Sequence, residues 1–475
     1  MKTPPFQLSD ENTEAPLRKQ RRVIVLAVLA FLLSGVPRLN ISIGFPLYAV
    51  DLCILYLLLK SKPVSFSQYR GHPQTIVKLI SCYLLFAILG ELHGGLVYGR
   101  PFESIYMLVR SCLAISIAYI IPQQIRTFEE LRFTLKGICL GLFLSGCIAI
   151  LYSMPATRGL TDVVFSLKAI VPNSDSIVGV ANIAYDQNFD GSYRGLTLIG
   201  TSTFSSGAMA TLWPLIFMMG VPSKLTGFWQ RLHKVALIVV PLGILATYGR
   251  SAWLSVVLVG ASSMLWGSNR VRTRLVFFFL LASLAFGQWG FESISANLPL
   301  VDRVVSKTQI VIEHGATRES EAERFLAYVE PFSHITKYPS FAFAGSGIAQ
   351  RRWGGNFYGE AETASHAIPG IAYYTYGAGG AICQVGLMLL TIMTAYKRLS
   401  LAQKHLPGAI WVWRSLLACW FGLLPWWCFG HGIVTEPRGA GIFFFFIGVV
   451  LACDRLSTTA YAQEILKQSA LLRSN

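Results

Sequence analysis

The chain has 475 residues and a formal net charge of +16, and 53% of its residues are hydrophobic while only 13% are charged. With a mean hydropathy of +0.52, this composition excludes a soluble globular protein, because about a quarter of the residues of such proteins are charged. The positive charge does not indicate a nucleic-acid-binding protein, since no basic stripe interleaved with aromatic residues is present.

Apolar runs of about 17–25 residues recur from one end of the chain to the other, and such runs are long enough for membrane-spanning helices. In chain order, we expect spans at Val23–Val36, Ile43–Leu59, Leu79–Val97, Ser104–Ile121, Gly137–Tyr152, Gly195–Val221, Val235–Tyr248, Ala252–Gly267, Leu275–Phe291, Gly377–Tyr396, Trp411–Val434 and Ala440–Cys453.

The predicted architecture is an all-α, polytopic membrane bundle of about 12 helices. A polar cytoplasmic tail (residues 1–22) precedes helices 1–9 (residues 23–291), and helices 10–12 (residues 377–453) precede a second cytoplasmic tail (residues 454–475). A long, polar, extracytoplasmic loop (residues 292–376) separates helices 9 and 10. Lys or Arg occurs in every loop that this alternation puts inside, which predicts that both termini are cytoplasmic.

The nine cysteines lie within or beside apolar runs, and none has the spacing of zinc ligands. They are typical of small buried hydrophobic residues. No HExxH motif, Ser-His-Asp arrangement or Walker loop is present. The sequence therefore implies no metal, no disulfide and no cofactor.

Arg250 lies in the very short loop between the seventh and eighth spans, in the segment Tyr248-Gly249-Arg250-Ser251-Ala252-Trp253. Counting spans puts it on the outer side, where positive charge is under-used. A helix is expected to begin directly after it, and a guanidinium beside free helix N–H groups makes a good anion site. The competing interpretation is that Arg250 has no functional role and that its side chain only extends to the membrane–water interface.

Two residues of the outer loop, Arg324 and His366, are further candidates. Ser320 and Glu323 have the spacing of a capping box, so a helix is expected to start there with Arg324 in its first turn. Arg324 is either functional or ion-paired with an adjacent glutamate. His366 returns to the same membrane face as Arg250, and histidine is the side chain most easily set up as a base near neutral pH.

Other arginines are candidates for substrate binding. Arg110 lies inside the fourth span, where its charge is costly unless it is paired or faces a cavity. Arg351 and Arg352 lie in a glycine-rich part of the loop and could contact anionic headgroups or a glycan. Arg438 lies on the outer face, where the last two spans meet.

Three more features lie on the outer side. The turn Gly345-Ser346-Gly347 is short for a phosphate cradle, but it has the required glycines. Glu91 and His93 are expected near the outer end of the third span.

The order of these features resembles the bacterial O-antigen ligase/polymerase superfamily. The turn from Tyr248 to Leu254 is similar to the family's Ser/Gly-Arg-small-Ala-Trp turn. The other similar features are Arg324 followed by Pro339 and Gly345-Ser346-Gly347, and His366 followed by Tyr374 and Gly377–Gly380. The chain departs from the family at Ala367, where Asn is usual. The resemblance covers the topology of the whole chain and, in sequence, mainly residues 248–390.

The resemblance implies an inverting, metal-independent glycosyltransferase of the GT-C type. Its donor would be a glycan on undecaprenyl diphosphate at the outer face of the bacterial inner membrane. Arg250 and Arg324 would stabilise the diphosphate leaving group, and His366 would take the proton from the acceptor hydroxyl. The acceptor would be a second glycan or lipid A-core, and the further partners expected are membrane lipids and other polysaccharide-assembly proteins.

Four interpretations remain at this point. The chain polymerises repeat units, which Ala367 favours, or it is a ligase that moves the glycan to lipid A-core. A transporter of a small anion or a lipid-linked precursor would instead show inverted repeats, broken helices and ionisable groups near mid-membrane. In a non-catalytic scaffold, Arg250, Arg324 and His366 would not need to lie close together.

Overall fold

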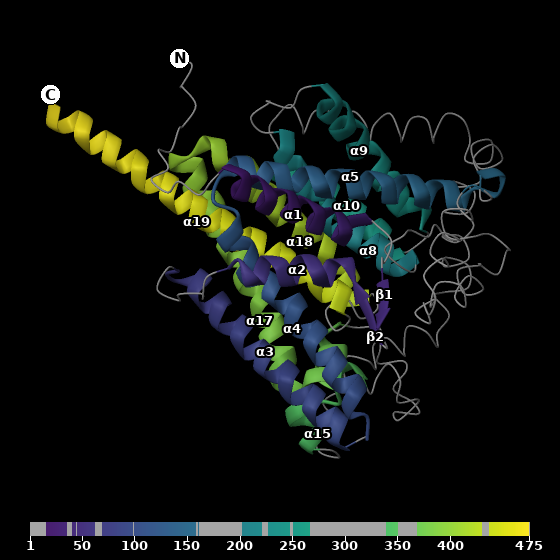
Figure 1. Ribbon diagram of the computed structural model, residues 1–475. Helices are drawn as coiled ribbons and strands as arrows, with labels where there is room; N and C mark the ends of the chain where they lie inside the picture. Colours follow the sequence, from purple (N-terminus) through teal and green to yellow (C-terminus); the bar gives the residue numbers. More distant parts are fainter. Residues whose placement is uncertain are drawn as a thin grey trace.

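The computed structural model describes residues 16–35, 40–43, 45–61, 69–97, 99–157, 160, 202–220, 227–247, 250–266, 339–349, 368–429 and 437–474. Within these ranges the protein is a bundle of α-helices with one short β-hairpin (Figure 1). Seven of the described helices are long and apolar enough to cross a membrane. The chain is therefore a multi-pass helical membrane protein, and the expected all-α membrane class is confirmed.

Four long helices in the N-terminal part follow the expected apolar runs. They are α1 (Pro16–Gly35), α3 (His72–Val97), α4 (Pro101–Gln124) and α5 (Phe128–Ser153), and the short 3₁₀ turn η2 (Pro155–Thr157) follows α5. A capping box starts α5, because the Thr127 hydroxyl accepts from the Glu130 N–H while the Glu130 carboxylate accepts from the Thr127 N–H. In the bundle, α1 packs against α5 and α3 packs against α4.

The single helix expected over Ile43–Leu59 is wrong. An antiparallel hairpin of β1 (Asn40–Ile43) and β2 (Phe45–Tyr48) precedes α2 (Ala49–Leu59), which has only 11 residues. Pro46 explains the difference, because proline has no N–H for a helix and disfavours the helical conformation of the residue before it. At 1.5 Å per residue, α2 is about 16 Å long, which is about half of the hydrocarbon thickness of a membrane.

The middle of the chain also departs from one long helix. Instead of a continuous span over Gly195–Val221, the structure has α8 (Ser202–Leu212) and the 3₁₀ helix η4 (Trp213–Gly220). Pro214 lies at this change and cannot donate a backbone hydrogen bond. The next helices, α9 (Gly227–Ala246) and α10 (Arg250–Trp266), follow the seventh and eighth expected spans.

The C-terminal part contains a broken helix. Its elements are α15 (Pro339–Ala344), α17 (Ile368–His405), η6 (Pro407–Ala409), α18 (Ile410–Phe429) and α19 (Pro437–Ser474). The backbone of α17 is not helical at Gly377, where φ is 72° and ψ is −176°. The tenth expected span corresponds to the part after this break. The ninth expected span, Leu275–Phe291, lies outside the described residues.

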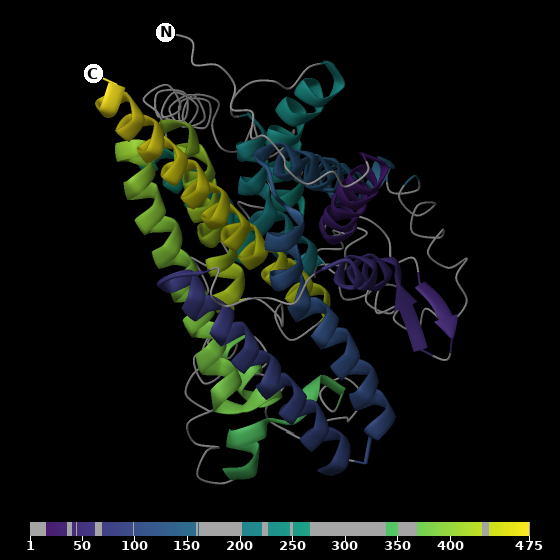
Figure 2. The ribbon, with the colours of Figure 1, turned by 60° about the vertical axis from the view of Figure 1, so that its left-hand side comes forward.

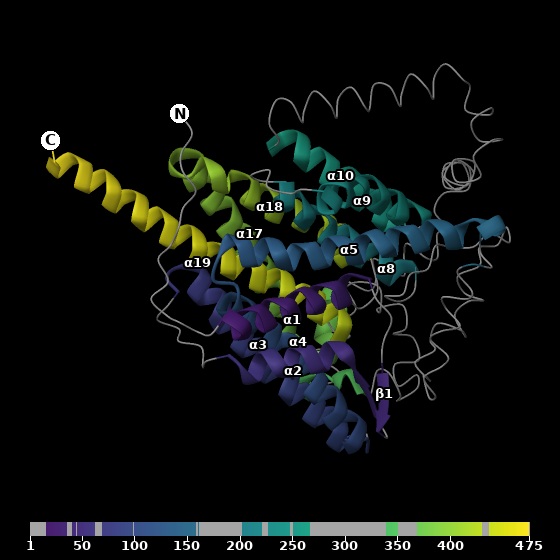
Figure 3. The same cartoon turned by 45° about the horizontal axis from the view of Figure 1, so that its top comes forward.

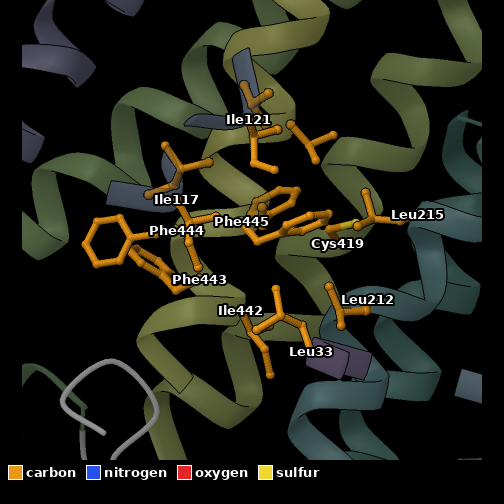
Figure 4. Close-up of a cluster of buried hydrophobic side chains, with 14 of the residues drawn as sticks. Leu33, Ile117, Ile121, Leu212, Leu215, Cys419, Ile442, Phe443, Phe444 and Phe445 are labelled. Carbon is orange, nitrogen blue, oxygen red and sulfur yellow. The ribbon is translucent and has the colours of Figure 1, made fainter. Parts of the chain in front are cut away.

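The central helix of the bundle is α19. Its four consecutive phenylalanines, Phe443–Phe446, are fully buried and pack among side chains of α1, α4, α8, η4 and α18 (Figure 4). Gly448 allows α4 to come close, because a Cβ atom there would lie 2.8 Å from a side-chain carbon of Ile121. Beyond the core, α19 continues as a helix that projects from the bundle (Figure 3).

One end of the bundle gathers basic side chains and is called the basic end here. It contains the second turn of α1 and the first turn of α5, which the buried ion pair between Arg22 and Glu130 joins at 2.8 Å. The ends of α2 and α4 meet there through the hydrogen bond from Gln124 to Ser61 (2.8 Å), and Arg455 of α19 donates to the Ile125 carbonyl.

The opposite end of the bundle contains the turn between α3 and α4, which lies beside α15 at the bottom of Figure 2. It also contains the start of α10. Gly243 near the end of α9 packs on Gly146 near the end of α5, and α5 begins at the basic end. The α9–α10 turn therefore lies at the end opposite the basic side chains.

Candidate functional site

The turn that carries Arg250 joins α9 to α10, and α10 begins at Arg250 as the sequence predicted. The side chain of Arg250 itself lies outside the described residues. The Trp253 indole N–H donates to the Leu245 carbonyl at 3.1 Å, and the Thr247 hydroxyl donates to the Ile244 carbonyl at 2.7 Å. These bonds satisfy carbonyls of the last turn of α9, which otherwise have no partner inside the helix. Trp253 thus fixes the backbone at which α10 starts.

The first turns of α10 are also fixed to the rest of the bundle. The Ser255 hydroxyl donates to the Gly422 carbonyl of α18 at 2.8 Å. Gly422 in turn allows α8 to approach, because a Cβ atom there would lie 2.1 Å from the Ala210 carbonyl oxygen. The start of α10 is therefore held by α8, α9 and α18 together.

A second feature of this end is the junction of α3, α15 and α17, where three backbones approach closely. A Cβ atom at Gly94 of α3 would lie 1.9 Å from the Ser346 carbonyl oxygen, and one at Gly90 would lie 2.6 Å from the Thr375 carbonyl oxygen. The backbone N–H of Ser346 donates to the Tyr374 carbonyl at 2.9 Å, and the Ser346 hydroxyl donates to the same oxygen at 3.1 Å. The segment after α15 is thereby tied to both α3 and the first part of α17.

The carboxylate of Glu91 lies at the centre of this junction and is fully buried. Its Oε1 accepts the Ile348 N–H at 2.7 Å, and its Oε2 accepts the Ala349 N–H at 3.5 Å. The donors that follow the turn Gly345-Ser346-Gly347 are thus taken by Glu91, and the Ser346 N–H is taken by Tyr374. Three N–H groups in and directly after this turn are therefore already bonded within the protein, which counts against the hypothesis of a phosphate cradle here.

His93 makes another contact in the junction, from the same helix as Glu91. Its Nδ1 lies 2.6 Å from the Gly345 carbonyl oxygen. Since a carbonyl only accepts hydrogen bonds, Nδ1 carries the proton in this contact. Gly345 has a positive φ of 73°, a conformation that side chains with Cβ rarely adopt.

Arg110 has a carboxylate partner, Asp51. The Arg110 Nε lies 3.6 Å from Asp51 Oδ2, and Nη1 donates to the Tyr106 hydroxyl at 3.4 Å. The guanidinium also lies over the Tyr48 ring, 4.3 Å from its centroid. Asp51 accepts the Tyr48 N–H at 3.3 Å, so the pair ties α4 to the first turn of α2. All of Arg110, Asp51 and Tyr48 are buried.

The structure places the backbone of two predicted site residues at the end opposite the basic side chains. The backbone of Arg250 opens α10 there, and the backbone of Arg438 lies in the first turn of α19, whose later residue Arg455 is at the basic end. The remaining predicted residues lie outside the described part of the chain: Arg324, Arg351, Arg352 and His366.

Sequence reasoning placed Glu91 and His93 at the outer end of α3 but assigned them no role. The available signal was the pair Gly90 and Gly94, which flanks Glu91 at the spacing of one helix face and marks a close approach of another backbone. Asp51 was missed because it stands alone in an apolar run, and an acidic residue inside a membrane segment is itself a signal.

No protein-family model matches this chain, and a search of curated proteins finds no significant match. The function of this chain is therefore inferred from its own residues. Among the described residues, no group of three His, Cys, Asp or Glu side chains lies together as a metal site would require. At this end, the described residues include two backbone segments that are held in place: the start of α10 at Arg250 and the segment after α15, which is bonded to Glu91.

Proposed function

We propose that the protein is an integral membrane glycosyltransferase that moves a glycan from undecaprenyl diphosphate to an acceptor sugar hydroxyl. The proposed reaction polymerises polysaccharide repeat units of the O-antigen or exopolysaccharide type. The observation that carries the proposal is the motif Tyr248–Trp253. The helix starts at its arginine, and its tryptophan braces the turn at the end of the bundle away from the basic side chains. An arginine at a helix start suits a diphosphate because the guanidinium and the N–H groups of the first helical turn both donate hydrogen bonds to phosphate oxygens.

In the proposed reaction the acceptor oxygen attacks the anomeric carbon of the donor glycan, and the bond from that carbon to the diphosphate breaks. Undecaprenyl diphosphate leaves with the bonding electrons, and Arg250 and Arg324 stabilise its growing negative charge. His366 takes the proton that the acceptor hydroxyl loses. Arg351, Arg352 and Arg438 are proposed to bind phosphate or glycan oxygens of the substrates. For Arg110 the ion pair with Asp51 favours a structural role.

The proposed topology has twelve spans, and the loop over residues 292–376 faces the periplasm. The basic end would then lie in the cytoplasm, with both termini, because cytoplasmic loops of membrane proteins are enriched in Lys and Arg. The proposed location is the bacterial inner membrane, and the proposed partners are the lipid-linked donor, a glycan acceptor and other polysaccharide-assembly proteins.

The test uses the full-length protein in nanodiscs with undecaprenyl-diphosphate-linked repeat units. A ladder of longer glycans in the absence of any core acceptor is expected from the wild type. Alanine at Arg250, Arg324 or His366 should abolish the ladder, whereas Leu92→Ala on the exposed face of α3 should not. Strict dependence on added lipid A-core would make the protein a ligase instead, and a full ladder from the His366 variant would refute the assigned base.

A second candidate function is transport of a small anion or lipid-linked precursor, and the break in α17 favours it. Transporters place ligands where helices are broken and where ionisable groups lie within the membrane. In this structure the break at Gly377 follows Thr375, whose carbonyl approaches Gly90, the residue before the buried Glu91. Proteoliposomes loaded with labelled substrate distinguish the two. Uptake without any new glycosidic bond supports the transporter and contradicts the transferase.

A further inference from the structure

Lys136 of α5 is a half-buried cation for which the described residues supply no carboxylate partner. It is the ninth residue of α5, and the apolar run that we expect to cross the membrane begins directly after it, at Gly137. If this run fills the hydrocarbon, the Lys136 ammonium lies at the level of the lipid headgroups. A charged side chain beside the hydrocarbon is costly unless it is paired, so Lys136 is a candidate for binding an anion.

The side-chain contacts of Lys136 include two aromatic rings. Its Nζ lies 5.2 Å from the centroid of the Trp229 ring of α9 and 5.7 Å from the centroid of the Phe133 ring of α5. The ring faces attract the ammonium but carry no net charge, so they hold it in place without neutralising it. Lys136 is therefore held between α5 and α9, and no described residue compensates its charge.

A second cation lies at nearly the same level on α9. Gly146 of α5 approaches Val239 of α9, since a Cβ atom at Gly146 would lie 2.9 Å from the Val239 carbonyl oxygen. With the contact between Lys136 and Trp229, this approach shows that the two helices run in the same direction. Arg231 is exposed and follows Trp229 by two residues, or about 3 Å along the axis of α9. The two cations are therefore at nearly the same depth.

Arg231 belongs to an exposed and otherwise apolar face of α9. Phe228, Arg231 and Val235 share this face at positions i, i+3 and i+7, and all three side chains are exposed. The Phe228 ring packs edge-on against Trp229, the ring that also contacts Lys136. The exposed face of α9 therefore continues to Lys136 of α5.

The charge of this face is positive. The helix α9 carries Arg231 and Lys234, both exposed, and contains no acidic residue. On α5 the nearest acids in sequence, Glu129 and Glu130, precede Lys136 by seven and six residues, and Glu130 is already in a buried ion pair. A basic site between membrane helices, with apolar side chains beside it, fits an anionic lipid headgroup and its acyl chains.

We propose that this face of α5 and α9 binds an anionic phospholipid. Lys136 and Arg231 contact its phosphate, and Phe228 and Val235 pack against its acyl chains. The lipid supplies the negative charge that the described residues do not offer to Lys136. This role concerns the lipid around the protein and does not depend on the proposed glycan transfer.

The test titrates the full-length protein in detergent micelles with dioleoyl phosphatidylglycerol or dioleoyl phosphatidylcholine, which share their acyl chains while only the first has a net negative charge. Native mass spectrometry separates the protein with no lipid from the protein with one lipid and gives the Kd of the first lipid. The variants are Lys136→Gln, Lys136→Arg and Arg231→Gln. The matched control is Lys60→Gln, which removes an exposed cation at the end of α2, a helix that packs mainly on α1 and α4.

The wild type should bind phosphatidylglycerol at least about tenfold more tightly than phosphatidylcholine. Lys136→Gln and Arg231→Gln should each weaken the binding of phosphatidylglycerol about fivefold, the contribution expected of one cation near an anionic headgroup, and should leave the binding of phosphatidylcholine unchanged. Lys136→Arg keeps the charge and should bind within about twofold of the wild type. Lys60→Gln should match the wild type.

Equal affinity of the wild type for the two lipids overturns the proposal. The same loss in Lys60→Gln as in Lys136→Gln overturns it as well, because this result shows a general attraction to the basic end. If Lys136→Gln does not fold, Arg231→Gln at its exposed position carries the test, and wild-type binding by that variant overturns the proposal. Tighter binding of undecaprenyl phosphate than of phosphatidylglycerol, with the same loss in both variants, would assign the face to a polyprenyl-linked ligand and overturn the phospholipid.

Discussion

Replacing Asp51 with leucine should destabilise the bundle by leaving Arg110 buried without its carboxylate. The guanidinium lies nine residues into α4, about 14 Å along the helix axis, which is deep enough for hydrocarbon on either side. At the observed Nε–Oδ2 distance of 3.6 Å, Coulomb's law with an effective dielectric constant of about 20 gives about 4–5 kcal/mol of attraction. Breaking buried pairs typically costs about 3–5 kcal/mol.

The rings of Tyr48 and Tyr106 remain in the variant and retain part of the stabilisation. Their cation–π contacts are each worth about 0.5–2 kcal/mol, so the expected loss for Asp51→Leu is about 3 kcal/mol in the free energy of unfolding. Unfolding is measured by SDS titration in mixed micelles, followed by tryptophan fluorescence. Val109→Ala, whose parent side chain is 53% exposed on the adjacent position of α4, is the control and should change little.

The double variant Asp51→Leu with Arg110→Met decides whether the pair itself matters. Two apolar side chains leave no charge uncompensated, so most of the lost stability should return, to within about 1–2 kcal/mol of the wild type. A double variant no more stable than the sum of the two single losses would refute the reasoning. The same protein then tests the role of Arg110: a folded double variant that makes no glycan would show that Arg110 contacts substrate.

Three further changes probe other contacts. Glu130→Gln weakens both the ion pair with Arg22 and the start of α5, and it should lower the unfolding free energy by about 1–3 kcal/mol. This loss should be the same at low and high NaCl concentration, because the pair is buried, so a strong salt dependence would contradict its burial. Gly137→Ala would put a Cβ atom 2.1 Å from the Ala27 carbonyl oxygen and should weaken the packing of α1 on α5. Gly260→Ala, which has open space around it in α10, should be neutral or stabilising by up to about 1 kcal/mol. The thermal unfolding temperatures of the two variants should shift in opposite directions or by clearly different amounts. Trp253→Phe removes the hydrogen bond to the Leu245 carbonyl and should lower the unfolding free energy by only about 1 kcal/mol. If the turn positions Arg250, the folded variant should nevertheless make less glycan product than the wild type. The same amount of product as the wild type would show that this hydrogen bond is not needed.

The local pattern of the sequence predicted most of the helical framework. Apolar runs fix where a chain can lie in hydrocarbon, because every buried backbone N–H and C=O must be paired within the segment. The start of α10 at Arg250 also follows from nearby residues, whereas the helical residues Ile368–Tyr376 before the break at Gly377 were expected to belong to the outer loop. The failure over Ile43–Leu59 has a local cause too, since Pro46 lies inside the apolar run and hydropathy alone does not register it.

Contacts between distant segments were decided only by the tertiary structure. Nothing around Asp51 in the sequence indicates that Arg110 is its partner, and nothing near Glu91 indicates that Ile348, 257 residues away, donates to it. The placement of α19 at the centre of the bundle is of the same kind, because all the spans are similarly apolar. Hydropathy determines which segments enter the membrane, whereas small residues and buried polar groups determine which segments meet there, and that choice depends on the shape of both partners.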